Sequence, residues 1–304
     1  MAYWKALRLL LLAGHIAAGL AAALAFPLLA PAVRAGLKTL WSRGALFLLG
    51  VRRVTQGAAP CPGSLIVANH VSWLDVLAIH AVCPTAFVCK QEIASWPALG
   101  WLLKRAGTVF MRRASAWSAW RSVCAVVPML RGGVSVTVFP EATTTLGDAV
   151  LPFYPAFFQS AVNAAGVVQP AAILFTGTDG ARRYEPAYVG ETSFGESLLE
   201  LAGASSLTVT VAFLPAFSAA GLTRRQAAQR SQELIASRIR HPEVAAVAST
   251  GTMRLAGKRI VKRLPLPCLL STSRLAWCRA TACFTMARPR PVPPVSRERL
   301  RSTR

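Results

Sequence analysis

An uncharged apolar stretch near the amino terminus constrains the fold of this chain more than any other feature. Residues 9–33 run for 25 positions without a formally charged side chain. Lys5 and Arg8 come before the stretch, and Arg34 and Lys38 follow it. Because a bilayer-spanning helix needs roughly 20 apolar residues, the stretch predicts a membrane-embedded anchor, whose orientation the charges on both flanks leave open.

Two other interpretations of this stretch stay open. It could be a signal peptide cleaved near residues 30–32, although the apolar region of a signal peptide is usually only about 7–15 residues long. It could also be a buried core helix. Residues 36–51 favour a second helix in the membrane interface, so residues 1–55 would form either one spanning helix or a membrane-dipping hairpin.

Composition and charge also favour contact with lipid. Hydrophobic residues make up 54% of the chain and charged residues only 15%, which is apolar for a soluble enzyme. The net charge is +22, and residues 252–304 hold thirteen basic residues and one acidic residue. We expect this segment to be a basic tail, disordered at its end, that lies on anionic membrane lipids. No zinc-finger spacing or RNA-binding signature accompanies the charge, so nucleic acid is not an expected partner.

The cysteine pattern bears on the compartment. There are seven cysteines, an odd number, and no C-x-x-C pair. Such a pattern is typical neither of a disulfide framework nor of a metal site, and it favours reduced thiols on the cytosolic side. We therefore expect no bound metal, and a location at the cell (inner) membrane with the main domain facing the cytoplasm.

From about residue 60 the pattern changes to short apolar runs that alternate with helical segments. We expect strands near residues 64–68, 85–89, 107–111, 134–139, 167–174 and 206–213. We expect helices near residues 73–82, 96–105, 115–131, 155–165 and 223–240. This alternation predicts an α/β fold for residues 56–251, with a mostly parallel central sheet flanked by helices.

One expected turn of this domain combines an imidazole with a carboxylate. His70 and Asp75 lie five residues apart, directly after the apolar run 65–68. On a regular helix they would occupy different faces, so they can meet only if His70 precedes the helix. Ser72, followed three residues later by Asp75, resembles a capping box with Ser72 as the N-cap. The alternative is that Asp75 only caps the helix and His70 is an ordinary loop residue.

Further segments follow this turn in a recognisable order. They are Lys90-Gln91-Glu92, Gly107-Thr108-Val109-Phe110-Met111-Arg112, Phe139-Pro140-Glu141-Ala142-Thr143 and Val168-Gln169-Pro170-Ala171-Ala172. Together with Asn69-His70 and Asp75, they resemble the N-H-x-x-x-x-D, G-x-x-F-x-x-R, F-P-E-G-T and V-P-x-x motifs of the membrane glycerolipid acyltransferases of the lysophosphatidic acid acyltransferase type. Each motif is weak by itself, but four in order are specific, and the resemblance covers about residues 60–215.

The resemblance implies an enzyme that moves an acyl chain from acyl-CoA or acyl-ACP to the free hydroxyl of a lysophospholipid, first of all lysophosphatidic acid. His70 would be the general base, and Asp75 would hold its tautomer and stabilise the imidazolium, so no cofactor is expected. The substrate-binding residues that the motifs imply are Asn69, Arg112, Glu141, Thr143 and Lys90. Arg112 could clamp a phosphate, whereas Lys90 could equally lie on the surface.

Ala142 departs from the family pattern, which has glycine at this position. The extra methyl group could obstruct the acceptor or disfavour a positive φ, so the departure puts the acceptor in doubt. Two alternatives therefore stay open: a lyso-ornithine lipid O-acyltransferase with the same chemistry, and a non-catalytic membrane protein that only binds lipid.

Overall fold

The structure is a computed structural model that describes residues 2–111, 116–204 and 206–241. Its centre is an eight-stranded sheet with the order β1-β7-β6-β2-β5-β3-β4, and β8 pairs with β6. The strands are β1 (Val51–Gln56), β2 (Leu65–Ala68), β3 (Ala86–Lys90), β4 (Val109–Met111), β5 (Val136–Val138), β6 (Val167–Thr176), β7 (Leu207–Phe213) and β8 (Phe217–Ser218). Only the pairings of β6 with β7 and with β8 are antiparallel, so the predicted α/β fold with a mostly parallel sheet is confirmed.

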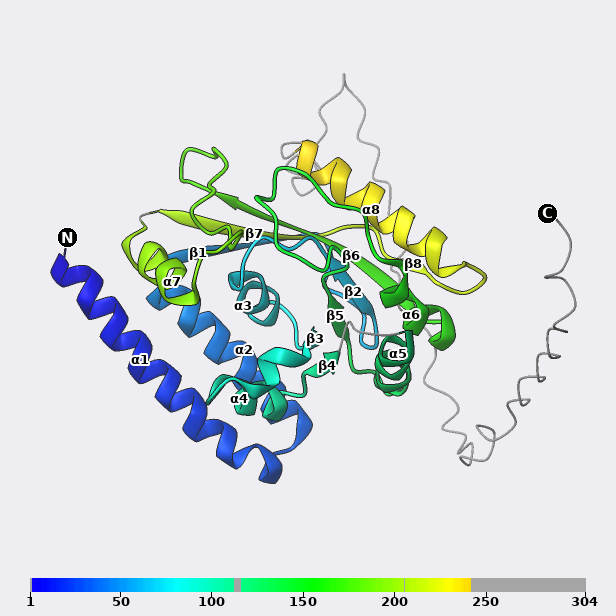
Figure 1. Cartoon of the computed structure of the whole chain (residues 1–304), viewed down its shortest axis with the longest axis horizontal. Helices are drawn as coiled ribbons and strands as arrows, with labels where there is room; N and C mark the ends of the chain where they lie inside the picture. Colours follow the sequence, from blue (N-terminus) through cyan, green and yellow to red (C-terminus); the bar gives the residue numbers. More distant parts are fainter. Residues whose placement is uncertain (1, 112–115, 205, 242–304) are drawn as a thin grey trace, which may run out of the picture. The chain divides into compact units, whose positions relative to one another are not determined.

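Helices cover both faces of this sheet (Figure 1). They are α1 (Ala2–Ala25), α2 (Pro31–Leu48), α3 (Leu74–His80), α4 (Leu99–Arg105), α5 (Ala116–Arg131), α6 (Gln159–Ala164), α7 (Phe194–Gly203) and α8 (Arg224–Arg240). Three short 3-10 helices accompany them, η1 (Phe26–Leu28), η2 (Gln91–Ser95) and η3 (Pro155–Phe158). In the described part of the chain, α1, α2, α3 and α7 contribute to one core cluster, and α5, α6 and α8 contribute to the other.

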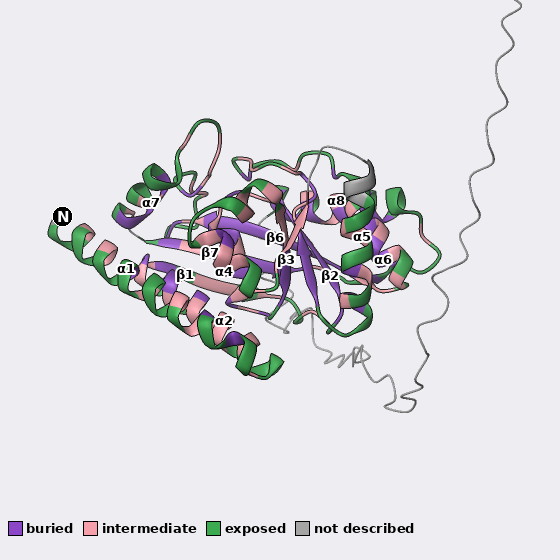
Figure 2. Cartoon of the chain, turned by 60° about the horizontal axis from the view of Figure 1, so that its bottom comes forward, coloured by how far each residue is buried: buried purple, intermediate pink, exposed green. Residues whose placement is uncertain are grey.

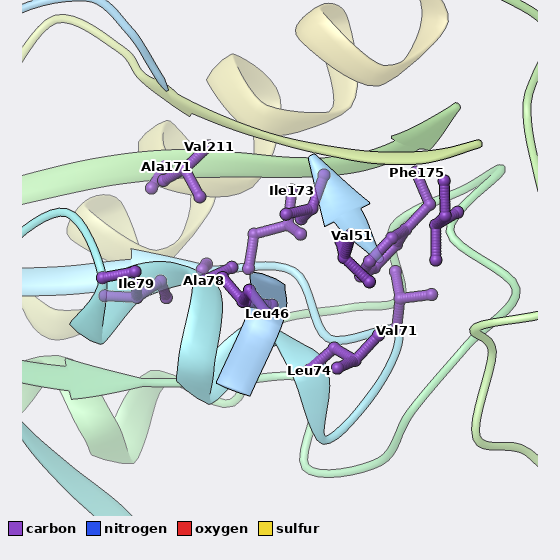
Figure 3. Close-up of a cluster of buried hydrophobic side chains, with 14 of the residues drawn as sticks. Leu46, Val51, Val71, Leu74, Ala78, Ile79, Ala171, Ile173, Phe175 and Val211 are labelled. Atoms are coloured by element: carbon purple, nitrogen blue, oxygen red, sulfur yellow. The ribbon is translucent and has the colours of Figure 1, made fainter. Parts of the chain in front are cut away.

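Side chains of β2 alternate between these two cores, as the pleat of a strand requires. Ile66 and Ala68 join the core beneath α2 and α3, whereas Leu65 and Val67 face α5 and α8. All four side chains are fully buried, and the central strands are buried along their length (Figure 2). Figure 3 shows the first core, where Leu46 of α2 lies among residues of α3 and the sheet.

The amino-terminal apolar stretch is not one helix. Pro27 lies in the 3-10 turn η1 and Pro31 begins α2, so the stretch 9–33 is divided between two helices. Proline lacks the backbone N–H that a helix interior needs, which explains the break. His15 of α1 and Trp41 of α2 exchange hydrogen bonds, each ring nitrogen meeting the other residue's carbonyl at 2.8 and 3.0 Å. The two helices therefore pack as a hairpin.

Three basic residues fasten this hairpin to the rest of the domain. Arg8, Lys38 and Arg43 donate hydrogen bonds of 2.9 to 3.2 Å to carbonyls at the carboxyl ends of α7, α4 and α3 respectively. The last carbonyls of a helix have no partner within it and carry partial negative charge, so cations are favourable there. Charges that flank the apolar stretch thus cap neighbouring helices.

The segment Tyr3–Leu28 has the length and composition of a membrane span, with a mean hydropathy of 2.1. Only 22% of the 18-residue apolar window within this segment is buried, which argues against a buried core helix. Its exposed large side chains are Tyr3, Trp4, Leu7, Leu10, Leu11, Ile16, Leu24 and Leu28. β1 straddles the boundary predicted at residue 55, so the hairpin leads directly into the sheet.

Candidate active site

The site forms where neighbouring parallel strands end. β2 and β5 are paired in parallel, with Val67 opposite Val138, so their carboxyl ends lie side by side. The turn after β2 begins at Asn69, and the loop after β5 begins at Phe139. Two motifs separated by about seventy residues in the chain therefore meet at one edge of the sheet.

Asn69 anchors the turn to β6. Its side-chain amide donates to the carbonyl of Ile173 at 3.0 Å and accepts from the N–H of Ile173 at 2.8 Å. The side chain is fully buried. These contacts continue the pairing of β2 with β6 beyond the end of the strand, and they favour a positioning role over the substrate contact predicted for Asn69.

His70 and Asp75 are in direct contact. Nδ1 of His70 lies 2.8 Å from Oδ2 of Asp75, and that oxygen also accepts the N–H groups of Val71 and Ser72 at 2.7 and 2.9 Å. Asp75 is fully buried, while 22% of the His70 side chain is exposed. Because the carboxylate can only accept, Nδ1 carries the proton and Nε2 keeps its lone pair.

The local geometry differs in one detail from the predicted capping box. The helix begins at Leu74, one residue later than expected, and Ser72 Oγ accepts from the N–H of Leu74 at 3.3 Å rather than from that of Asp75. The reciprocal bond from the N–H of Ser72 to Asp75 is present. Asp75 therefore has two functions, because it closes the first turn and holds the imidazole.

The ring of His70 is also held from its face. Phe139 stacks on it with ring centroids 4.0 Å apart and an angle of 13° between the planes. Phe87 stacks in turn on Phe139, with centroids 6.0 Å apart. The motifs assign no separate role to Phe139. Its place directly after β5, which pairs with β2, is a signal in the sequence that it lies near His70.

Glu141 lies buried beneath this turn, with only 3% of its surface exposed. Its Oε1 accepts the backbone N–H of His70 at 2.8 Å, and its Oε2 accepts that of Leu151 at 2.9 Å. Burial raises the pKa of Glu141, and the hydrogen bonds from Leu151 and His70 oppose this effect in part. Among the described residues, the contacts of the Glu141 carboxylate are therefore with backbone N–H groups, whereas the motifs imply a substrate-binding role for Glu141.

The remaining predicted residues are less closely grouped. Thr143 is exposed on the loop after Glu141, and Lys90 is exposed at the end of β3, opposite Met111 of β4. Arg112 lies outside the described residues. In the part of the chain that the structure describes, no three His, Cys, Asp or Glu side chains gather into a metal site.

Ala142 adopts a left-handed conformation with φ of 60°. The methyl group therefore does not prevent the positive φ that glycine would adopt more easily, although the conformation carries strain. The loop conformation is kept, and the extra methyl group is half-buried beside Glu141.

Comparisons with known proteins point to one protein family. A family model described as Acyltransferase matches residues 53–174. The chain is 39% identical over 174 residues to a 1-acyl-sn-glycerol-3-phosphate acyltransferase of Neisseria gonorrhoeae, which covers 57% of this chain and 68% of the relative. It is 33% identical over 180 residues to a lyso-ornithine lipid O-acyltransferase of Pseudomonas aeruginosa, covering 59% and 69%.

A solved structure shares the fold. The crystal structure of the 1-acyl-sn-glycerophosphate (LPA) acyltransferase PlsC from Thermotoga maritima matches with a TM-score of 0.57 and 19% identity. The match covers 79% of this chain and 98% of the other.

Proposed function

Because the chain belongs to the acyltransferase family that contains the bacterial 1-acyl-sn-glycerol-3-phosphate acyltransferases, we propose that it acylates lysophosphatidic acid to phosphatidic acid. The acyl donor is acyl-CoA or acyl-ACP. The observation that carries the proposal is the 2.8 Å contact between His70 and Asp75 at the carboxyl edge of the sheet. A histidine oriented in this way is suited to remove a proton from an alcohol near neutral pH.

The reaction needs one base and one positioned thioester. Nε2 of His70 takes the proton of the acceptor hydroxyl as its oxygen bonds to the thioester carbonyl carbon. Asp75 stabilises the imidazolium that forms, and it is the only carboxylate ion-paired with a histidine among the described residues. When the carbon–sulfur bond breaks, His70 returns the proton to the leaving thiolate. A base positioned in this way contributes roughly 10²–10⁴-fold to the rate.

Acceptor binding is proposed for residues around this centre. Arg112 follows β4 in the sequence and would clamp the phosphate with paired hydrogen bonds. Thr143 would bond the acceptor from its exposed loop, and Lys90, also exposed, would supply a second positive charge. Each of these roles predicts a raised KM for the acceptor, with kcat little changed, when the side chain is truncated.

A second acceptor has support of its own. The relative of Pseudomonas aeruginosa, 33% identical to this chain, is named for a lyso-ornithine lipid, and Ala142 stands where the family has glycine. We therefore keep lyso-ornithine lipid as the second candidate acceptor, with the same base and the same donor.

Membrane attachment is proposed through the α1–α2 hairpin, residues 1–55. The exposed apolar side chains of α1 would enter the cytoplasmic leaflet of the cell (inner) membrane. The basic segment 252–304, which lies outside the described residues, would add attraction to anionic lipid.

An acyl-transfer assay separates the two acceptors. Purified protein in vesicles receives one acyl donor and either lysophosphatidic acid or lyso-ornithine lipid, and acyl-CoA and acyl-ACP are compared in parallel. We expect a higher kcat/KM for lysophosphatidic acid. A higher value for lyso-ornithine lipid would select the second candidate, and no transfer to either acceptor would reject the proposed function.

A further inference from the structure

Glu141 makes contacts that a substrate-binding residue would not need. Its two oxygens are bonded to two backbone N–H groups from different segments, the turn after β2 and the end of the loop 142–150. Each oxygen retains a second lone pair, but the residue is only 3% exposed. A lipid head group therefore has almost no access to this carboxylate.

The same loop also holds the other end of the His70 peptide unit. The N–H of Thr145 donates to the carbonyl of His70 at 2.8 Å, and the Thr145 hydroxyl donates to the same carbonyl at 3.3 Å. Glu141 thus accepts the N–H of His70, and Thr145 donates to the C=O of His70. Both backbone polar groups of His70 are therefore bound, one by Glu141 directly before the loop 142–150 and one by Thr145 within it.

These bonds fix the direction in which the imidazole points. The position of the His70 Cα decides whether its ring can meet Asp75 through Nδ1 and stack on Phe139. A displacement of about 1 Å at a reacting group can cost on the order of 10²-fold in rate. The loop also carries Thr143, whose side chain is exposed.

We propose that Glu141 is a positioning residue that ties the backbone of His70 to both ends of the loop 142–150, so that the base and this loop keep one fixed geometry. The inference rests on the proposed role of His70 as the base. It assigns Glu141 no contact with substrate, and it predicts that Glu141 acts on kcat rather than on KM.

The test uses Glu141→Gln in the full-length protein. A glutamine has one carbonyl oxygen and one NH₂ group, so it can accept only one of the two backbone N–H groups. We expect kcat to fall by about 10- to 100-fold, with the acceptor KM changed less than twofold. Glu141→Ala, which removes both acceptors, should lower kcat further. A tenfold rise in acceptor KM with kcat intact would overturn the proposal.

Hydrogen exchange gives a readout that does not depend on activity. In Glu141→Gln, the peptides containing the amides of His70 and Leu151 should exchange faster, while those of the central strand β6 should not change. The matched control is Glu196→Gln, an exposed glutamate that accepts the N–H of Ser193 at the start of α7. Unchanged exchange at both His70 and Leu151 in Glu141→Gln would contradict the inference. If exchange is faster in Glu141→Gln but the wild-type protein transfers no acyl chain, only the proposed function is rejected.

Discussion

Oδ2 of Asp75 accepts three hydrogen bonds, from Nδ1 of His70 and from the N–H groups of the two residues that follow it. One oxygen therefore fixes the turn and the ring together. The imidazole can rotate out of this position only by leaving a fully buried carboxylate, which makes the pair a rigid unit.

Asp75→Asn tests the role of this carboxylate. The asparagine oxygen can still accept from Val71 and Ser72, but it carries no charge to stabilise the imidazolium, so we expect kcat to fall by roughly 10²–10⁴-fold. Steady-state acyl transfer measures the effect. Asp179→Asn, which alters the exposed ion pair with Arg183, is the control and should keep full activity. A fully active Asp75→Asn would remove Asp75 from the mechanism.

Ala142→Gly tests the strain in the loop beside the site. At a φ of 60° an alanine is disfavoured relative to glycine, so the change should stabilise the fold by up to about 1 kcal/mol, less the extra entropy of the unfolded chain. Thermal unfolding in detergent measures the gain. Ala165→Gly at the end of α6, with φ of 48°, should give a similar gain without any change in acceptor preference. A loss of stability in Ala142→Gly would mean that the left-handed conformation of Ala142 is not strained.

The environment of His80 predicts that the free energy of unfolding depends on pH. Burial and the nearby charge of Lys38 lower the pKa of His80 from 6.5 to about 4, and the hydrogen bond from its ring to the carbonyl of Thr85 opposes this effect in part. Because the folded-state pKa is depressed, the unfolded chain binds the proton more readily. The contribution of neutral His80 to the free energy of unfolding is intact above about pH 6.5. As the pH falls toward 4 this contribution is lost, which lowers the free energy of unfolding by roughly 3 kcal/mol.

Denaturant unfolding between pH 4 and 7 checks this prediction. His80→Gln should flatten the profile over this range, because glutamine does not titrate. His241→Gln, the same substitution at an exposed position after α8, is the matched control for the loss of an imidazole. An identical slope in wild type and His80→Gln would contradict the assignment.

Arg8→Met tests the fastening of the hairpin. The variant keeps an apolar side chain of similar length on α1 but loses both hydrogen bonds to the carbonyls at the carboxyl end of α7. We expect a loss of about 1–2 kcal/mol in the free energy of unfolding, measured in detergent. Arg52→Met, at an exposed position of β1, is the control. Equal stability of the two variants would mean that Arg8 does not fasten the hairpin.

The sequence was informative where apolar runs alternate with helical segments. All six predicted strands occur, because each is a short apolar run next to a turn signal. β1 was missed because its sequence, VRRVTQ, shows two charged residues and no apolar run, yet it pairs with β7 along its length. α7 was missed although Ser193 and Glu196 form a complete capping box, a signal present in the sequence.

The site was predictable only in part. The pairing of His70 with Asp75 follows from local reasoning, because both lie around one helix start. The partners of Glu141 and Asn69 could not be predicted in the same way, because both residues bond backbone groups of segments distant in the chain. Which N–H groups lie at that edge depends on how β2, β5 and β6 pair.

The most direct test of the central claim is the kcat of His70→Ala for acyl transfer to a lyso-lipid, with folding checked by thermal unfolding. If His70 is the general base, kcat falls by at least about 100-fold while the protein stays folded. If the folded variant transfers acyl chains at the wild-type rate, His70 is not the base and the mechanism is wrong.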